Sequence, residues 1–343
     1  MIETGEILAA ISTLQERGEP MALATIVSVS GSTYRRPGAR LLVAPHGDPI
    51  GNISGGCLED DVARIGREVI ASGEPRLVTF DLTGEGDAIW GYGMGCNGVI
   101  DVFIEPTRGA VQAAAVLGAG DDATMITVVE SARAESPVGS RLVLWADGRR
   151  EGGVGPAFEA AAHPGIVSVP GARAFVETVR APLKLLVCGA GPDAVPLVRQ
   201  AYELGWHVTV ADVRRRLLTA VRFPGATAFV TGDDIGPEAG SYAVLMNHNY
   251  LRDAACLRTL LGCELAYLGV VGPRARTEKL LHELDAVDAL PGLHAPAGLD
   301  LGAEGPEEVA RSIVAEILAV QRGRGAGFLR DRHGAIHGDQ PPM

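Results

Sequence analysis

The chain has 343 residues, of which 47% are hydrophobic and 21% charged, and its formal net charge is −12 at pH 7. This apolar content argues against wholesale disorder, and the length exceeds the size at which one hydrophobic core usually stops growing, so two domains are expected. The acidic charge opposes electrostatic attachment to nucleic acid or to an anionic membrane surface. We therefore expect neither nucleic acid nor a membrane as a partner.

Cysteine usage and the first residues indicate the compartment. The five cysteines are odd in number and widely spaced, which is typical of reduced thiols rather than of a disulfide framework. The first twenty residues carry acidic side chains and lack the basic start and cleavage site of a secretory signal. No uncharged apolar run approaches the roughly 18 residues of a membrane-spanning helix. A soluble, cytoplasmic protein is predicted.

The first part of the chain, residues 1–180, is predicted to be an α+β domain. Helices are expected over 2–17 and from about Leu58 to Gly73, where apolar residues recur at helical spacing. Segments rich in β-branched and apolar residues predict strands at 21–32, 39–45, 76–82, 98–106, 123–132, 140–148 and around Ile166. The pairing of the last three is left open, so residues 106–180 either extend the first sheet or form a subdomain.

From about Leu183 the pattern becomes a regular alternation of strand and helix. Strands are expected at 184–191, 206–212, 226–233, 242–247 and 265–272, and helices at 192–205, 251–261, 274–286 and 306–323. Because parallel strands need crossover connections, this alternation predicts a parallel sheet with helices on both faces, and the 226–233 and 242–247 strands are expected to be buried. The predicted fold class is α/β, with a Rossmann-like domain at 181–325 and a flexible tail at 326–343.

A glycine turn between the first strand and helix of this domain is the strongest motif. Gly189 and Gly191 begin a G-x-G-x-x-A pattern, and Asp212 ends the next strand, as in dinucleotide-binding turns. Two features make the assignment of a dinucleotide ligand less certain than the motif alone suggests. Asp193 adds a negative charge to the first helical turn, and arginines at 214–216 could hold a further anion. A scaffold that has lost dinucleotide binding is the alternative.

A second glycine turn precedes the helix at 274–286. Gly272 and Arg274 place a helix N-terminus and a guanidinium where ligands of open α/β sheets collect, although solvated surface arginines are the alternative. His248 and Asp253 follow the neighbouring strand and are secondary candidates, since a single histidine at such a position is more often structural than catalytic.

Two cysteines of the first domain lie in glycine-rich loops. Cys57 follows Gly55 and Gly56 at a predicted helix N-terminus, where the helix dipole favours the thiolate, and Cys96 lies in a second such loop. Both are candidates for a reactive thiol or a metal ligand, whereas Cys188, Cys256 and Cys263 are interpreted as core residues.

An arginine cluster in the first domain is the last candidate. Arg36 and Arg40 belong to the turn 34–40, which would suit a phosphate or carboxylate partner; solvated turn arginines are the alternative.

Together these segments resemble the XdhC/CoxI family of accessory proteins for xanthine dehydrogenase and related molybdenum hydroxylases. The resemblance covers most of the chain, and it departs from common members at Asn97 and Pro273, where glycine and serine are frequent. It is carried by the segments 34–40, 51–59, 95–98, 104–106, 188–196, 267–274, 296–303 and 306–310.

The resemblance implies a chaperone that binds the molybdenum cofactor (molybdopterin), supports its sulfuration with a cysteine desulfurase, and delivers it to a xanthine dehydrogenase-type hydroxylase. It further implies a homodimer, a non-catalytic role, and Cys57 or Cys96 as a ligand to molybdenum. We expect the phosphate end to bind the Gly189 and Gly272 turns, with the cofactor in a hollow shared with the cysteine loops.

Two other functions remain open at this point. One is an NAD(P)-dependent oxidoreductase that uses Cys57 or His248, although no convincing acid/base pair for hydride transfer is visible, and NAD(P) or another nucleotide would then be the cofactor. The other is a non-catalytic scaffold that binds only a partner protein.

Overall fold

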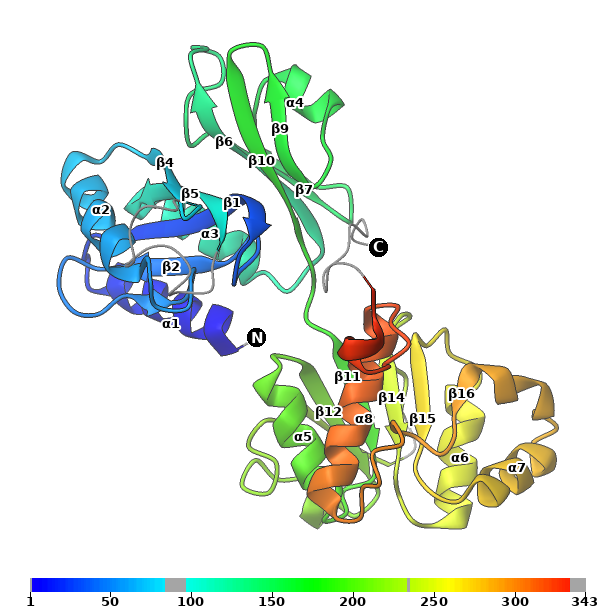
Figure 1. Cartoon of the computed structure of the whole chain (residues 1–343). Helices are drawn as coiled ribbons and strands as arrows, with labels where there is room; N and C mark the ends of the chain where they lie inside the picture. The colour runs from blue at the N-terminus through cyan, green and yellow to red at the C-terminus, as the bar shows by residue number, and fades with distance from the viewer. Residues whose placement is uncertain (1, 84–96, 233–234, 334–343) are drawn as a thin grey trace. The chain divides into compact units, whose positions relative to one another are not determined.

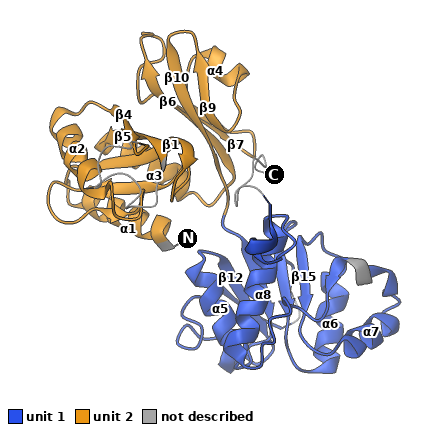
Figure 2. Cartoon of the chain, viewed as in Figure 1, with its two compact units in different colours: residues 1–2, 182–338 blue, residues 3–181, 339–343 orange. Residues whose placement is uncertain are grey.

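The structure, a computed structural model, describes residues 2–83, 97–232 and 235–333 (Figure 1). The chain divides into two compact units (Figure 2). We call Glu3–Ala181 the N-terminal unit and Pro182–Gly338 the Rossmann unit. Each unit has its own sheets and its own cores, and they are described separately below.

The N-terminal unit opens with a five-stranded antiparallel sheet, in the order β3-β2-β1-β5-β4. Its elements are α1 (Ile2–Glu16), β1 (Ala22–Ser32), β2 (Arg40–Val43), β3 (Ile50–Gly51), α2 (Glu59–Ser72), β4 (Arg76–Asp81), β5 (Asn97–Pro106) and α3 (Thr107–Leu117). Alternate residues of β1 face opposite sides, so Ala22, Ala24 and Ile26 pack with α2, while Leu23 packs with α1 and α3. The sheet is therefore covered on both faces.

A second antiparallel sheet follows, in the order β8-β7-β6-β10-β9. Its elements are β6 (Ala123–Ser131), β7 (Arg141–Trp145), β8 (Arg150–Gly152), α4 (Pro156–Ala160), β9 (Gly165–Val169) and β10 (Ala172–Val179). Residues 106–180 thus contain a separate sheet rather than an extension of the first. The two sheets of this unit share a small core of Val27 and Phe103 with Val129 and Phe175.

The Rossmann unit contains six parallel strands in the order β13-β12-β11-β14-β15-β16, which confirms the predicted α/β fold class and parallel sheet. The strands are β11 (Lys184–Cys188), β12 (His207–Asp212), β13 (Ala228–Thr231), β14 (Tyr242–Leu245), β15 (Tyr267–Val270) and β16 (Leu293–His294). The helices are α5 (Ala194–Glu203), α6 (Tyr250–Leu260), α7 (Arg274–Glu283) and α8 (Pro306–Gln321), with 3-10 turns η1 (Arg215–Leu217), η2 (Val287–Gly292) and η3 (Leu329–Asp331).

Alternation along β11 again separates two faces of the sheet. Leu185 and Val187 pack with α5 and α8, whereas Leu186 and Cys188 pack with α6 and α7. The prediction that 226–233 forms a buried strand was wrong about burial. β13 is an edge strand, with β12 as its neighbour, and its side chains are largely exposed. Of the predicted tail 326–343, residues 334–343 lie outside the described residues.

Candidate functional site

The candidate site lies at the carboxyl edge of the Rossmann sheet. In the observed strand order, β11 and β14 are neighbours at the centre, and the chain leaves them for helices on opposite faces. Such a switch point opens a crevice in which α/β proteins bind ligands. The loops after β11, β12, β14 and β15 all reach this edge because the strands are parallel.

Gly189 allows two of these loops to approach each other. Its φ of +122° lies in the region that favours glycine, and a Cβ atom there would be 2.6 Å from the carbonyl oxygen of Met246 and 3.0 Å from Cα of Asn247. Its N–H donates to the carbonyl of Ala211 at 2.8 Å. The first motif glycine therefore joins the ends of β11, β12 and β14.

Asp212 ends β12 and is completely enclosed, with a side chain 0% exposed. Its Oδ2 accepts a hydrogen bond from the Ala190 N–H at 2.8 Å and from Arg214 Nη2 at 2.7 Å, and its Oδ1 accepts from the N–H and Nε of Arg214 at 2.7 and 2.9 Å. Burial alone would raise the pKa of this carboxyl, but these hydrogen bonds and the Arg214 charge outweigh it and hold the pKa well below its usual range. Asp212 is therefore a fixed anion at the sheet edge.

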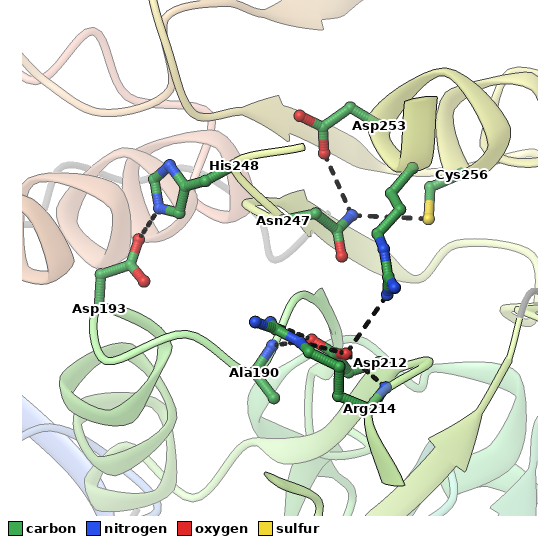
Figure 3. A network of polar contacts seen from close by, with 9 residues as sticks. Ala190, Asp193, Asp212, Arg214, Asn247, His248, Asp253 and Cys256 are labelled. Carbon is green, nitrogen blue, oxygen red and sulfur yellow. Dashed lines mark hydrogen bonds and ion pairs between the residues drawn. The ribbon is translucent and has the colours of Figure 1, made fainter. Parts of the chain in front are cut away.

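Asp193 and His248 meet at the switch point, as Figure 3 shows. Asp193 is the N-cap position of α5, and its Oδ2 lies 2.5 Å from Nε2 of His248 in the loop after β14. Its other oxygen, Oδ1, is buried without a hydrogen-bond partner among the described residues. The sequence predicts that the Asp193 carboxylate lies where an anionic ligand would bind. In the structure this carboxylate faces the His248 imidazole.

A second polar group joins the loop after β14 to α6 and α7. Nδ2 of Asn247 donates to Oδ1 of Asp253 at 3.1 Å and contacts Sγ of Cys256 at 3.7 Å (Figure 3), and Arg276 pairs with Asp253 at 2.5 Å. Asp253 is 1% exposed, so it anchors α7 to the edge. Hydrogen bonding to Cys256 and burial raise the pKa of the Cys188 thiol well above its usual range, which keeps it protonated.

The structure brings together only part of the predicted Rossmann site. Gly191 and Gly272 lie on the loops of this edge, and the exposed Arg274 begins α7, but Arg276, two residues further on, makes the ion pair. Arg252 and Asn247 were not predicted. Arg252 follows the cap residue Asn249 on α6, and its Nη1 lies 3.6 Å from Oδ1 of Asp212. The sequence signal that could have identified them is the mostly polar segment 247–252, which follows the buried strand β14.

In the N-terminal unit, Glu59 organises the loop that contains Cys57. Its carboxylate accepts hydrogen bonds from the N–H groups of Ile53, Ser54, Gly56 and Leu58 and from the Ser54 hydroxyl. Burial opposes its ionisation, but these hydrogen bonds lower the pKa of the Glu59 carboxyl. The donors at the start of α2 are therefore directed to Glu59.

Cys57 itself is half-buried. Its Sγ lies 3.7 Å from the carbonyl oxygen of Ser54, and its N–H donates to the Ser54 hydroxyl at 3.1 Å. The Tyr34 ring lies against Gly55, where an added Cβ would be 3.3 Å away, so the loops 33–39 and 52–58 are neighbours. Cys96 lies outside the described residues.

The two predicted arginines of this unit differ. Arg36 is exposed, whereas Arg40 is 7% exposed and pairs with Glu177 of β10 while donating to the carbonyl of Gly38 at 2.7 Å. Of the three cysteines interpreted as core residues, Cys188 and Cys256 are buried, and the prediction for Cys263 was wrong because it lies half-buried in the turn after α6.

Across residues 2–83, 97–232 and 235–333, three or more His, Cys, Asp or Glu side chains are nowhere gathered as a metal site would require. In the same ranges, none of the helices has the length and apolar character needed to cross a membrane.

The fold and the site define a Rossmann-type α/β protein preceded by an α+β unit. Residues 14–81 match the model of the XdhC and CoxI family, and residues 185–317 match that of the XdhC Rossmann domain. The chain is 31% identical over 338 residues to a protein of Bacillus subtilis (strain 168) named as a probable xanthine dehydrogenase component, and the match covers 93% of this chain and 98% of that protein. The chain belongs to the XdhC and CoxI family.

Two further relatives agree with this membership. The molybdenum cofactor insertion chaperone PaoD of Escherichia coli (strain K12) is 24% identical over 308 residues, covering 89% of this chain and 84% of that protein. The crystal structure of a xanthine dehydrogenase from Bacillus halodurans is similar with a TM-score of 0.78 and 30% identity, over 93% of this chain and 97% of that chain.

Proposed function

We propose that this chain is a cytoplasmic, homodimeric accessory protein that binds the molybdenum cofactor and loads it into a xanthine dehydrogenase-type molybdenum hydroxylase. The names of two relatives support the proposal, one a probable xanthine dehydrogenase component and the other a molybdenum cofactor insertion chaperone. The observation that carries it is the sheet edge at Gly189, where a glycine turn and the Arg214 and Arg252 guanidinium groups meet at the switch point of the sheet.

The residues at this edge fit the phosphate end of molybdopterin. Arg214 and Arg252 are partly exposed, with side chains 42% and 35% accessible, and Nη1 of Arg252 is a buried donor without a hydrogen-bond partner among the described residues. A phosphate oxygen would satisfy such a donor. When bound, the cofactor would supply the dithiolene-held molybdenum centre of the client enzyme, and this chain would hold and orient it.

Cys57 is the proposed thiol for the sulfur chemistry. This half-buried cysteine lies in a loop whose backbone N–H groups donate hydrogen bonds to Glu59, so the fold positions its thiol. We propose that Cys57, with Cys96, takes part in handling the cofactor while a cysteine desulfurase supplies sulfur. Arg36, which is exposed on the neighbouring loop, is proposed to contact an anionic part of the cofactor or of a partner.

The NAD(P)-dependent alternative receives less support from the geometry. In dinucleotide enzymes the acid at the end of the second strand accepts hydrogen bonds from ribose hydroxyls. Here the Asp212 carboxylate already accepts four hydrogen bonds from the protein. The scaffold alternative differs from our proposal in predicting that no cofactor is bound at all.

The test is co-purification. The full-length chain is incubated with molybdopterin or with NADPH, passed through gel filtration, and analysed for molybdenum, pterin and nucleotide. We expect retained pterin, together with activation of an apo-hydroxylase that depends on this chain. Nucleotide turnover without pterin retention would favour the oxidoreductase, and retention of neither would favour the scaffold.

A further inference from the structure

We infer that the end of β12 is a subsite for a phosphate monoester, formed by Arg214 and Arg252 on the buried Asp212, and that it replaces the ribose-diol site of a dinucleotide-binding protein. The inference rests on the proposed function for the identity of the ligand: if the chain binds molybdopterin, the phosphate of molybdopterin occupies this subsite. It concerns which part of a ligand this edge recognises and which ligands it rejects.

The first step is that Asp212 has no free acceptor. A carboxylate offers about four lone-pair positions. Asp212 accepts four hydrogen bonds of 2.7–2.9 Å, one from the Ala190 N–H and three from Arg214, and its side chain is 0% exposed. A ribose diol would have to displace Arg214 from a two-point ion pair before it could bind this carboxylate.

The second step is that Arg214 retains unused donors. Its guanidinium carries five N–H groups, and Asp212 takes one from Nε and one from Nη2. The remaining fork, between Nη1 and Nη2, has no partner among the described residues, and the side chain is 42% exposed. Two parallel N–H groups of this kind match the oxygens of a phosphate.

The third step is a second cation on the same carboxylate. Nη1 of Arg252 lies 3.6 Å from Oδ1 of Asp212, which is beyond hydrogen-bond distance, and it is buried without a hydrogen-bond partner among the described residues. Two guanidinium groups on one carboxylate leave a net charge of about +1 at the end of β12. Asp212 therefore acts as a positioning residue for two arginines.

The experiment uses the full-length chain and pairs of probes that differ by one phosphate. The first pair is the fluorescent pterin obtained by oxidising molybdopterin, before and after phosphatase treatment, and the second pair is NADPH and NADH. Binding is measured by fluorescence for the wild type, Arg214→Gln, Arg252→Gln and the control Arg215→Gln, an exposed neighbour in η1. Arg252→Gln guards against misfolding of the Arg214 variant, since Arg252 Nη1 makes no hydrogen bond to any residue that the structure describes.

We expect the phosphorylated pterin to bind the wild type and Arg215→Gln at least about tenfold more tightly than the dephosphorylated pterin, as for a charge-assisted contact. This preference should vanish in Arg214→Gln and shrink in Arg252→Gln. Equal affinity of the two pterins for the wild type, or an undiminished preference in both variants, would overturn the inference.

The other outcomes separate the inference from the proposed function. A preference for NADPH over NADH that requires Arg214, without pterin binding, would support the subsite and contradict the cofactor-carrier function. If the wild type binds neither pair, inorganic phosphate is titrated against chloride at equal ionic strength while the arginine Nε–H signals are followed by NMR. A response of Arg214 that Arg252→Gln weakens supports the subsite, and no response refutes it.

Discussion

His248 Nε2 lies 2.5 Å from Asp193 Oδ2, and this contact joins the loop after β14 to the start of α5 across the switch point of the sheet. The backbone of His248 has a φ of +54°, which is uncommon outside glycine, so the ring is held toward Asp193 at some conformational cost. The imidazole thus contacts the only described carboxylate in the first-motif turn, Gly189–Ala194, where an anionic ligand would approach.

This contact predicts opposite effects of two substitutions on anion binding. Asp193→Asn should increase the affinity for the phosphorylated pterin by about fivefold, because it removes a negative charge at a helix N-terminus, and His248→Ala should decrease it. Fluorescence titration at low ionic strength measures both. Asp300→Asn, at an exposed aspartate before α8, is the control. A change of the same sign in the Asp193 and His248 variants would contradict the prediction.

Gly189 should tolerate substitution less well than Gly191. An added Cβ at Gly189 would lie 2.6 Å from a backbone oxygen at positive φ, whereas at Gly191 it would meet the movable Asp193 Oδ1. We expect Gly189→Ala to lower the free energy of unfolding of the Rossmann unit by about 1–3 kcal/mol and to abolish ligand binding, with a smaller effect of Gly191→Ala. Urea unfolding tests this when it is followed by fluorescence in a background that keeps Trp206 as the single tryptophan, and equal losses would count against it.

The buried pair Arg141–Glu105 should be costly to break from one side. Arg141 Nη2 lies 2.8 Å from Glu105 Oε2, and both side chains are nearly inaccessible, at 6% and 4%. Arg141 lies on β7 and Glu105 on β5, so the pair links the two sheets of the N-terminal unit, and Arg141 also donates to Thr127 and to the Gly109 carbonyl. Arg141→Met should reduce the free energy of unfolding by about 3–5 kcal/mol because it leaves an unpaired buried carboxylate.

Two further variants make this prediction specific. The double variant Glu105→Leu with Arg141→Met should be less destabilised than Arg141→Met, because no buried charge remains. The exposed pair Arg64–Glu68 serves as the control, and Arg64→Met should cost less than about 1 kcal/mol. Chemical denaturation measures all three, and a double variant at least as unstable as the single one would refute the account.

Asp212 predicts an acid dependence of stability. Its pKa is lowered in the folded chain because, despite burial, Arg214 and the Ala190 N–H hold the ionised form. The stabilisation is therefore complete above the unfolded value of about 3.9 and is lost as the pH falls toward the lower folded value. Between pH 6 and pH 3 the wild type should lose more unfolding free energy than Arg214→Gln, and parallel pH profiles would exclude this coupling.

Cys57 should affect the cofactor but not the fold. Cys57→Ala removes a half-buried thiol that packs against the core beneath α2 and whose polar contact is a 3.7 Å approach to the Ser54 carbonyl. Because alanine keeps part of this packing, the thermal midpoint should change little. We expect lower cofactor retention or weaker activation of the client, because the proposed role requires the thiol. Cys263→Ala, at a half-buried cysteine of the other unit, is the control. Unchanged activation by Cys57→Ala would remove Cys57 from the site.

Some features of this protein were readable from local sequence. The alternation after Leu183 predicted a parallel sheet, and the two glycines before a helical pattern predicted a turn at Gly189, because both depend on spacing along the chain. The predicted helix from about Leu58 to Gly73 likewise corresponds to α2, which ends at Gly73 in a left-handed cap.

Other features were decided only by tertiary structure. Arg40 was predicted to bind a phosphate or carboxylate partner, with a solvated turn arginine as the alternative. The structure shows instead that β2 begins at this residue and pairs it with Thr25, so its side chain enters the unit and meets Glu177, 137 residues away in the sequence. Asp212 was predicted to be the acid of a dinucleotide-type turn, but Ala190 approaches it from the loop after β11 and Arg252 approaches it from α6. Periodicity determines which segments form strands and helices, whereas the partners of a buried charge depend on strand order and packing between distant segments.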